Sequence, residues 1–163
     1  MSSLPVFADA VSRLHADIAI VRLLRAGISP ERISAVFPRR RAPNSVCCWM
    51  KNFHRVPLRA ALPVAAAGLL GPLLKRDVHS AKAERDLESL GLSAEQAERV
   101  LEKTREGLIV LCVHARNEKE AAIAWHIFRH VGADNVTPPH EDYLPASVRA
   151  SHLLSPSAGL AAA

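Results

Sequence analysis

Apolar and polar residues follow two different periods in the first part of the chain, and each period predicts an element. Residues 14–26 carry apolar side chains at helical spacing, and Gly27 is a suitable residue to end that helix. Residues 33–37 alternate with a β-branched bias, which predicts a strand that Pro38 closes. Residues 4–11 lack clean alternation and are assigned to a first strand on weaker grounds.

The same order of helix, glycine and strand returns later in the chain. Residues 82–90 form a helical pattern closed by Gly91, and residues 93–96 form a capping box for a helix to Glu106. The run from 108 to 114 is almost continuously apolar, which predicts a strand buried on both faces.

Residues 117–137 complete the elements predicted for the second half of the chain. Asn117 and Glu120 signal the start of a helix that runs through Val131 and ends at Gly132, and residues 135–137 predict a short closing strand. The predicted order is therefore strand, helix, strand, insertion, strand, helix, strand. This order predicts an α+β fold with a ferredoxin-like split βαβ plan.

These elements divide the chain into a predicted α+β domain over residues 1–140 and a tail. Its first half covers 4–38 and its second half 79–138, with a basic and apolar insertion over 39–76. The tail, 141–163, is rich in Ser, Pro and Ala and is expected to be flexible.

The insertion contains an uncharged run of 15 residues, 60–74, and is expected to be helical. A helix of that length spans roughly 22 Å. A bilayer core needs about 20 apolar residues, so the run is short for a crossing. Pro63 and Pro72 argue against one straight helix.

Positive charge is concentrated in the same insertion. The net charge is +5, yet no Asp or Glu lies between Glu31 and Asp77, so the centre is cationic and the flanks are mildly acidic. The charges and two aromatic rings give a candidate surface for a partner or an anion: Arg39, Arg40, Arg41, Trp49, Lys51, Phe53, Arg55 and Arg59.

Several occupants suit such a surface. A protein interface would use the apolar run for docking, an anionic membrane surface would use the same charges, and nucleic acid would bind through its phosphates. Nucleic acid is less favoured, because no RNP-like, helix-turn-helix or zinc-finger pattern is present. A solvated basic loop over the core is the remaining interpretation.

The first helix gives a second reason to expect a partner. Its apolar residues cover a wide arc, so the helix is expected to be buried on more than one side. Together with the apolar run at 60–74, this arc favours self-association. The residues concerned are Leu14, Ile18, Ile20, Val21, Leu23 and Leu24.

Candidate chemistry is sparse. Cys112 and His114 share one strand face, but a nucleophilic pair also needs an orienting group and an oxyanion donor, for which the sequence gives no sign. His126 and His130 have metal-binding spacing, yet they fall on the solvent side of their predicted helix. No catalytic residue, metal or cofactor is therefore assigned.

The three cysteines indicate the cellular compartment of the protein and whether it has redox chemistry. The adjacent Cys47 and Cys48 do not make a disulfide framework with Cys112, and the first residues do not resemble a secretory signal. A cytoplasmic protein, with membrane association left open, is expected. The basic surroundings of Cys47 and Cys48 could lower a thiol pKa, which keeps a redox role as an alternative.

Two motifs at the start of the chain resemble a known family. The segment Ala16-Asp17-x-Ala19-x-x-x-Leu23-x-x-Ala26-Gly27, followed by Ile33-Ser34-Ala35-Val36, is similar to the opening of bacterial general stress proteins, known as heat- or low-temperature-induced stress proteins. Residues 102–114 and 118–133 resemble the family's closing helix, strand and acid-capped helix. The glycine-rich central segment is shorter here, and Ala115 stands where the family usually has Gly.

The resemblance implies a stress-associated protein without established catalytic residues. With the charge pattern, it predicts a non-enzymatic binding or assembly module that self-associates or docks on a protein partner through its central segment. The alternatives are a peripheral membrane-surface stress protein and a thiol- or metal-dependent redox protein.

Overall fold

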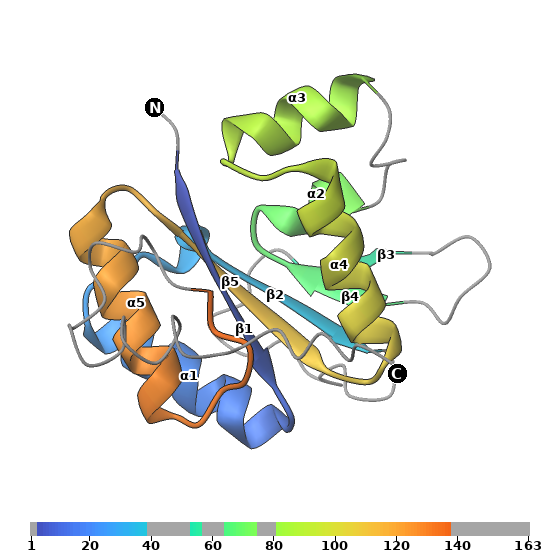
Figure 1. The fold of residues 1–163 in the computed structure, drawn as a ribbon. Helices are drawn as coiled ribbons and strands as arrows, with labels where there is room; N and C mark the ends of the chain where they lie inside the picture. The colour runs from blue at the N-terminus through green and yellow to red at the C-terminus, as the bar shows by residue number, and fades with distance from the viewer. Residues whose placement is uncertain (1–2, 39–52, 57–63, 75–80, 138–163) are drawn as a thin grey trace, which may run out of the picture.

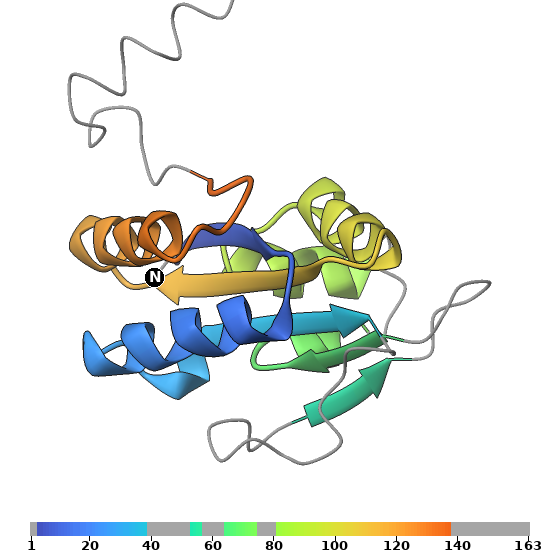
Figure 2. The same cartoon turned by 90° about the horizontal axis from the view of Figure 1, so that it is seen from below.

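A five-stranded antiparallel sheet with helices on both faces organises the chain (Figure 1). The computed structural model describes residues 3–38, 53–56, 64–74 and 81–137. The strands lie in the order β1-β5-β2-β4-β3, with β3 at the far edge from β1 (Figure 2). Their bounds are β1 Leu4–Ala10, β2 Ile33–Pro38, β3 Phe53–Val56, β4 Val64–Ala67 and β5 Ile109–Ala115.

The helices begin where the sequence supplies capping side chains. Ser12, Ser93 and Asn117 each accept a hydrogen bond from the backbone N–H three residues later, and Ser93 forms the predicted reciprocal capping box with Gln96. The helices are α1 Arg13–Arg25, α2 Leu70–Leu74, α3 Ala81–Ser89, α4 Ala94–Arg105 and α5 Glu118–His130, with a 3₁₀ turn over Pro30–Arg32.

Each face of the sheet carries its own apolar core. Helices α1 and α5 lie together on one face, and α2, α3 and α4 lie on the other (Figure 1). Because side chains alternate along a strand, β5 sends Ile109, Leu111 and Val113 to the first core and Val110 and Cys112 to the second. This explains the continuous apolar run of β5, all of which is buried as predicted.

The two halves of the chain interleave in the sheet. β5 pairs antiparallel with β1 on one side and with β2 on the other, so β1 and β2 run parallel on its two flanks. The closing segment lies on the outer edge of β1, where Asp134 and Asp9 exchange backbone hydrogen bonds and the N–H of Thr137 donates to the carbonyl of Phe7. The closing strand predicted over residues 135–137 is not formed, and an isolated bridge at Asp134, just before it, takes its place.

The expectation of a helical insertion is wrong for most of its described part. β3 and β4 form a hairpin-like antiparallel pair, β4 extends the sheet from β2, and only α2 is helical. Alanine favours a helix, but tertiary pairing overrides propensity: the residue before β4 is Pro63, and Ala66 is buried in the second core. Gly68, with a φ of 78°, then turns the chain from β4 toward α2.

The expectation that the first helix is buried on more than one side is also wrong for this chain. Ala16, Ala19, Ile20 and Leu23 form its single buried face. The wide arc arises because further apolar residues lie on the opposite side, where they remain exposed. Among the described residues, no helix is both long enough and apolar enough to cross a membrane.

Candidate functional site

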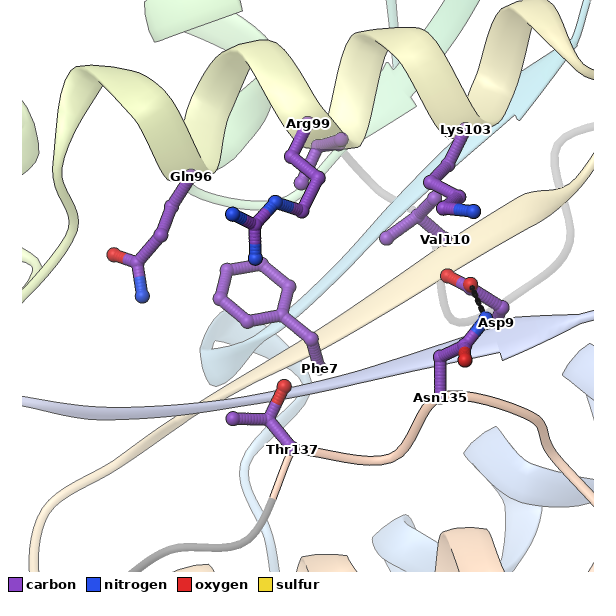
Figure 3. Close-up of a pocket in the computed structure, with 9 residues that line it drawn as sticks. Phe7, Asp9, Gln96, Arg99, Lys103, Val110, Asn135 and Thr137 are labelled. Carbon is purple, nitrogen blue, oxygen red and sulfur yellow. Dashed lines mark hydrogen bonds between the residues drawn. The ribbon is translucent and has the colours of Figure 1, made fainter. Parts of the chain in front are cut away.

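A pocket of about 310 Å³ lies between the sheet and α4 (Figure 3). Three parts of the chain form it: β1 and β5 supply the floor, α4 supplies one wall, and the segment after α5 supplies the other. Its lining combines aliphatic, aromatic, amide and charged side chains, namely Phe7, Asp9, Gln96, Arg99, Val100, Lys103, Val110, Asn135 and Thr137.

Strand and helix periodicity bring these residues together. Phe7 and Asp9 are two residues apart on β1 and therefore share the face that looks toward α4. Val110 is the register partner of Asp9 on β5. Arg99 and Lys103 are four residues apart on α4, and Figure 3 shows both side chains extending toward β1.

Asp9 is the buried polar residue of this pocket, with only 5% of its surface exposed. The side-chain amide of Asn135 donates a hydrogen bond of 2.8 Å to its Oδ2 atom (Figure 3). Burial raises the pKa of the Asp9 carboxyl, while the Asn135 hydrogen bond and the charge of Lys103 act in the opposite direction. Asn135 has a φ of 50°, a left-handed conformation that Asn tolerates well.

Each cation of the pocket forms an ion pair with a glutamate on the solvent side of α4. The Nη2 atom of Arg99 lies 3.0 Å from Oε1 of Glu95, and the Nζ atom of Lys103 lies 3.3 Å from Oε2 of Glu106. Such exposed pairs contribute about 0–1 kcal/mol, so either cation can exchange its partner for another anion at little cost.

A second polar cluster is buried on the same face of the sheet, between β2, β5 and the start of α2. The Oγ atom of Ser34 on β2 lies 3.0 Å from Nε2 of His114 on β5, and it also accepts a 3.3 Å hydrogen bond from the N–H of Leu70. Arg32 donates to the backbone carbonyl of His114. Burial, followed by the charge of Arg32, lowers the pKa of His114 to about 4.

This cluster does not form a reactive thiol site. Cys112 is the register partner of Ser34 and is completely buried, and burial raises the pKa of its thiol. A neutral, inaccessible thiol is a poor nucleophile. Cys112 therefore acts as a small apolar residue of the second core.

The paired histidines of α5 lie on its exposed side, as predicted. His130 interacts through Nδ1 with the backbone carbonyl of His126, 2.9 Å away. Within residues 3–38, 53–56, 64–74 and 81–137, no group of three or more His, Cys, Asp or Glu side chains is arranged to hold a metal ion.

An apolar stripe on the outer side of α1 is the main exposed apolar surface that the structure describes. Leu14 is 67% exposed, and Ile18 and Val21 continue the stripe along the helix, with Val11 just before it. Their spacing of three, four and three residues is that of alternating a and d positions in a coiled coil.

Most of the sequence-predicted partner surface lies outside the described residues. This holds for Arg39, Arg40, Arg41, Trp49, Lys51 and Arg59, and also for Cys47, Cys48 and the tail 141–163. Phe53 and Arg55 lie on β3, the strand farthest from β1 in the described sheet.

Sequence reasoning missed the pocket, although two signals for it were present. Asp9 is a carboxylate within the otherwise apolar strand β1, and Ser34 is a hydroxyl within the otherwise apolar strand β2. A polar residue inside an apolar strand needs a partner or a cavity, because an unpaired buried polar group is unfavourable. Asp9 faces the pocket and Ser34 meets His114.

Known proteins give no further guide to this site. Comparisons with protein-family models, with characterised proteins and with solved structures find no match to this chain.

Proposed function

We propose that this protein is a non-enzymatic binding and assembly module that self-associates through the outer face of α1. The exposed stripe of Leu14, Ile18 and Val21 is the observation that supports it. The stress association and the general stress protein family remain part of this proposal, on the motif resemblance described above.

The spacing of the stripe favours another helix as its occupant. Leu14, Ile18 and Val21 follow the three–four alternation that lets side chains of one helix insert between those of a facing helix. A second copy of α1 presents the same stripe, so a two-fold symmetric pair is self-complementary. Complete burial of a fully exposed side chain of this size contributes roughly 1.5–3 kcal/mol, and Leu14, which is 67% exposed, has the most of this to gain.

The strand arrangement supports the ferredoxin-like plan as a further part of the proposal. β1, α1 and β2 form a unit that β5 splits, and α5 returns the chain to the outer edge of β1. In this plan β3, β4 and α2 belong to the insertion over residues 39–76, and α3 and α4 precede β5 in the second half. α1 and α5 then share one face, and the outer side of α1 is left for a partner.

The central basic segment is retained as a second docking surface of the same module, at Arg39–Arg41, Trp49, Lys51, Phe53, Arg55 and Arg59. A protein partner is preferred there. A peripheral role at an anionic membrane is the alternative. Flotation with anionic vesicles separates the two, because only a membrane-bound chain rises with the vesicles, and that binding should weaken as salt is added. The Cys112–His114 geometry gives the redox alternative no support.

Light scattering coupled to size-exclusion chromatography tests self-association. The wild-type chain at tens of micromolar is expected to run as a dimer or larger species, and L14Q/I18Q is expected to run as a monomer. Gln retains helix propensity, so the double variant removes apolar contact without breaking α1.

R105Q is the matched control, because Arg105 is exposed on α4, on the other face of the sheet from α1. It should leave the assembly unchanged. A monomeric wild-type chain, or an L14Q/I18Q variant that still assembles with an unchanged circular dichroism spectrum, would show that the α1 face is not the interface.

A further inference from the structure

We infer that the pocket between β1 and α4 binds a small flat molecule that carries an acidic group at one end and a hydrogen-bond donor at the other. The chemical class is an amino-substituted ring bearing a carboxylate or a phosphate monoester. This ligand site is independent of the α1 face, which lies with α5 on the opposite side of the sheet.

The shape of the pocket sets the size of the ligand. Ligand pockets in proteins usually measure about 300–1,000 Å³, and a volume of about 310 Å³ lies at the small end of that range. Phe7, Val100 and Val110 give it an apolar lining suited to the face of one ring system. A long or branched molecule would not be enclosed.

The α4 wall recognises the acidic group. Arg99 and Lys103 stand one helical turn apart and reach into the same cavity (Figure 3). Their present partners, Glu95 and Glu106, are exposed residues outside the lining. A carboxylate or phosphate at the α4 side of the cavity can therefore be bound by both cations through charge-assisted hydrogen bonds, from the exposed Arg99 and the half-buried Lys103.

The β1 floor recognises the donor. Asp9 presents a carboxyl to the cavity that is buried from bulk water, and Asn135 bonds only one of its oxygens in the described structure. A buried carboxyl is tolerated when hydrogen bonds replace those that it made to water in the unfolded chain. A ligand N–H or O–H that donates to Asp9 would supply such a hydrogen bond. Gln96 and Thr137 supply further polar groups around the cavity.

The opposed charges explain why a free anion is a poor ligand. Inorganic phosphate bound beside Arg99 would gain nothing from Phe7 and would be repelled by an ionised Asp9. A molecule that places its acidic group beside the cations of α4 and its donor beside Asp9 on β1 makes favourable interactions at both ends of the pocket. The pocket is thus selective for a bifunctional ring over either end alone.

Two-dimensional amide NMR with titration of named probes tests the site. The probes are 4-aminobenzoate and 4-aminophenyl phosphate, which present the carboxylate and the phosphate version of the same chemistry. Benzoate lacks the donor, and inorganic phosphate lacks the ring. At least one of the first two should bind and shift the amides of Phe7, Asp9 and Asn135, at least ten-fold more tightly than benzoate or inorganic phosphate.

Three variants define the contacts. R99Q should weaken binding at least ten-fold, while R105Q, at an exposed position of α4 outside the lining, should not. D9N should remove most of the preference for 4-aminobenzoate over benzoate. L14Q/I18Q should bind normally, so failure of self-association and failure of ligand binding are distinguishable.

The inference is overturned by any of the following results. One is the absence of binding by 4-aminobenzoate and 4-aminophenyl phosphate at millimolar concentration. Another is shifts that map away from β1 and α4. The third is equal losses in R99Q and R105Q, or binding by inorganic phosphate as tight as by the ring compounds, which would indicate unspecific attraction to positive charge.

Discussion

Ser34 and His114 join the two central strands through a buried contact of 3.0 Å between Oγ and Nε2. The same hydroxyl accepts from the N–H of Leu70, so one small side chain connects β2, β5 and the start of α2. His114 is 1% exposed, and among the described residues its Nδ1 atom has no hydrogen-bond partner. A buried, uncharged imidazole of this kind makes stability depend on pH.

The first prediction concerns His114 and acid. Its pKa is lowered from 6.5 to about 4, so between these values the unfolded chain takes up a proton that the folded chain refuses. The free energy of unfolding should therefore fall as pH drops from 6.5 to 4, by about 3 kcal/mol from this residue. Urea unfolding at several pH values measures it.

H114Q is the variant that isolates this effect. It should lose stability at pH 7.5 but show a shallower decline between pH 6.5 and 4, because Gln does not titrate. If the two chains lose stability in parallel over this range, His114 does not have the lowered pKa.

The second prediction concerns Asp9. Its folded pKa lies above the ordinary value of 3.8, so its contribution to stability is greatest below that value and is lost as pH rises through the raised pKa. D9N should keep an acceptor for Asn135 without the buried charge, and it should melt at a higher temperature at pH 7.5.

The advantage of D9N over the wild type should vanish at pH 3.5, where the native carboxyl is protonated. Thermal melts of both chains at the two pH values decide this. An equal difference at both pH values would mean that the charge of Asp9 is not the cause.

The third prediction concerns the turn between β4 and α2. A Cβ atom at Gly68 would lie 2.3 Å from the carbonyl oxygen of Ile33, and the φ of 78° is itself unfavourable for alanine. G68A should lose roughly 2–5 kcal/mol of stability in chemical unfolding.

G107A is the control for backbone strain alone, since Gly107 also has a positive φ but meets no atom within 4 Å. It should lose about 1–2 kcal/mol. Similar losses in the two variants would contradict the close approach of Gly68 to β2.

The fourth prediction concerns the cap of α4. S93A removes the side chain that accepts from the N–H of Gln96 and should lower stability by about 1 kcal/mol. S29A is the matched control, because Ser29 occupies the N-cap position of a 3₁₀ turn but makes no side-chain capping hydrogen bond. Its change should stay within about 0.5 kcal/mol, and a similar loss in both would refute the capping role.

Helix starts and buried strands were predicted correctly where they depend on residues that are close together in the sequence. The capping residues Ser93 and Asn117 fixed two helix starts, and the apolar run of β5 predicted a strand buried on both faces. β1 was also predicted, despite its weaker pattern. These features depend on neighbours in sequence, which the sequence displays directly.

Features that depend on distant residues were harder to predict. The helix expected within 60–67 became β4, because the edge of β2 offered hydrogen bonds to a short alanine-rich segment. The pocket joins residues 7 and 9 to residues 96–103 and 135–137, and no periodicity links such positions. Asp9, a polar residue in an apolar strand, indicated that a partner or a cavity was needed. Which residues surround it depends on the order of the strands, which the sequence pattern did not predict.

The place of β5 in the sheet also has a consequence for how the chain is made. β1 and β2 belong to the first 38 residues, but they do not pair with each other, and both depend on a strand that is synthesised some 70 residues later. Until residue 115 has left the ribosome, two apolar strands lack their common neighbour. The sheet should therefore close late in synthesis, which makes this chain a candidate for help from chaperones while it is being translated.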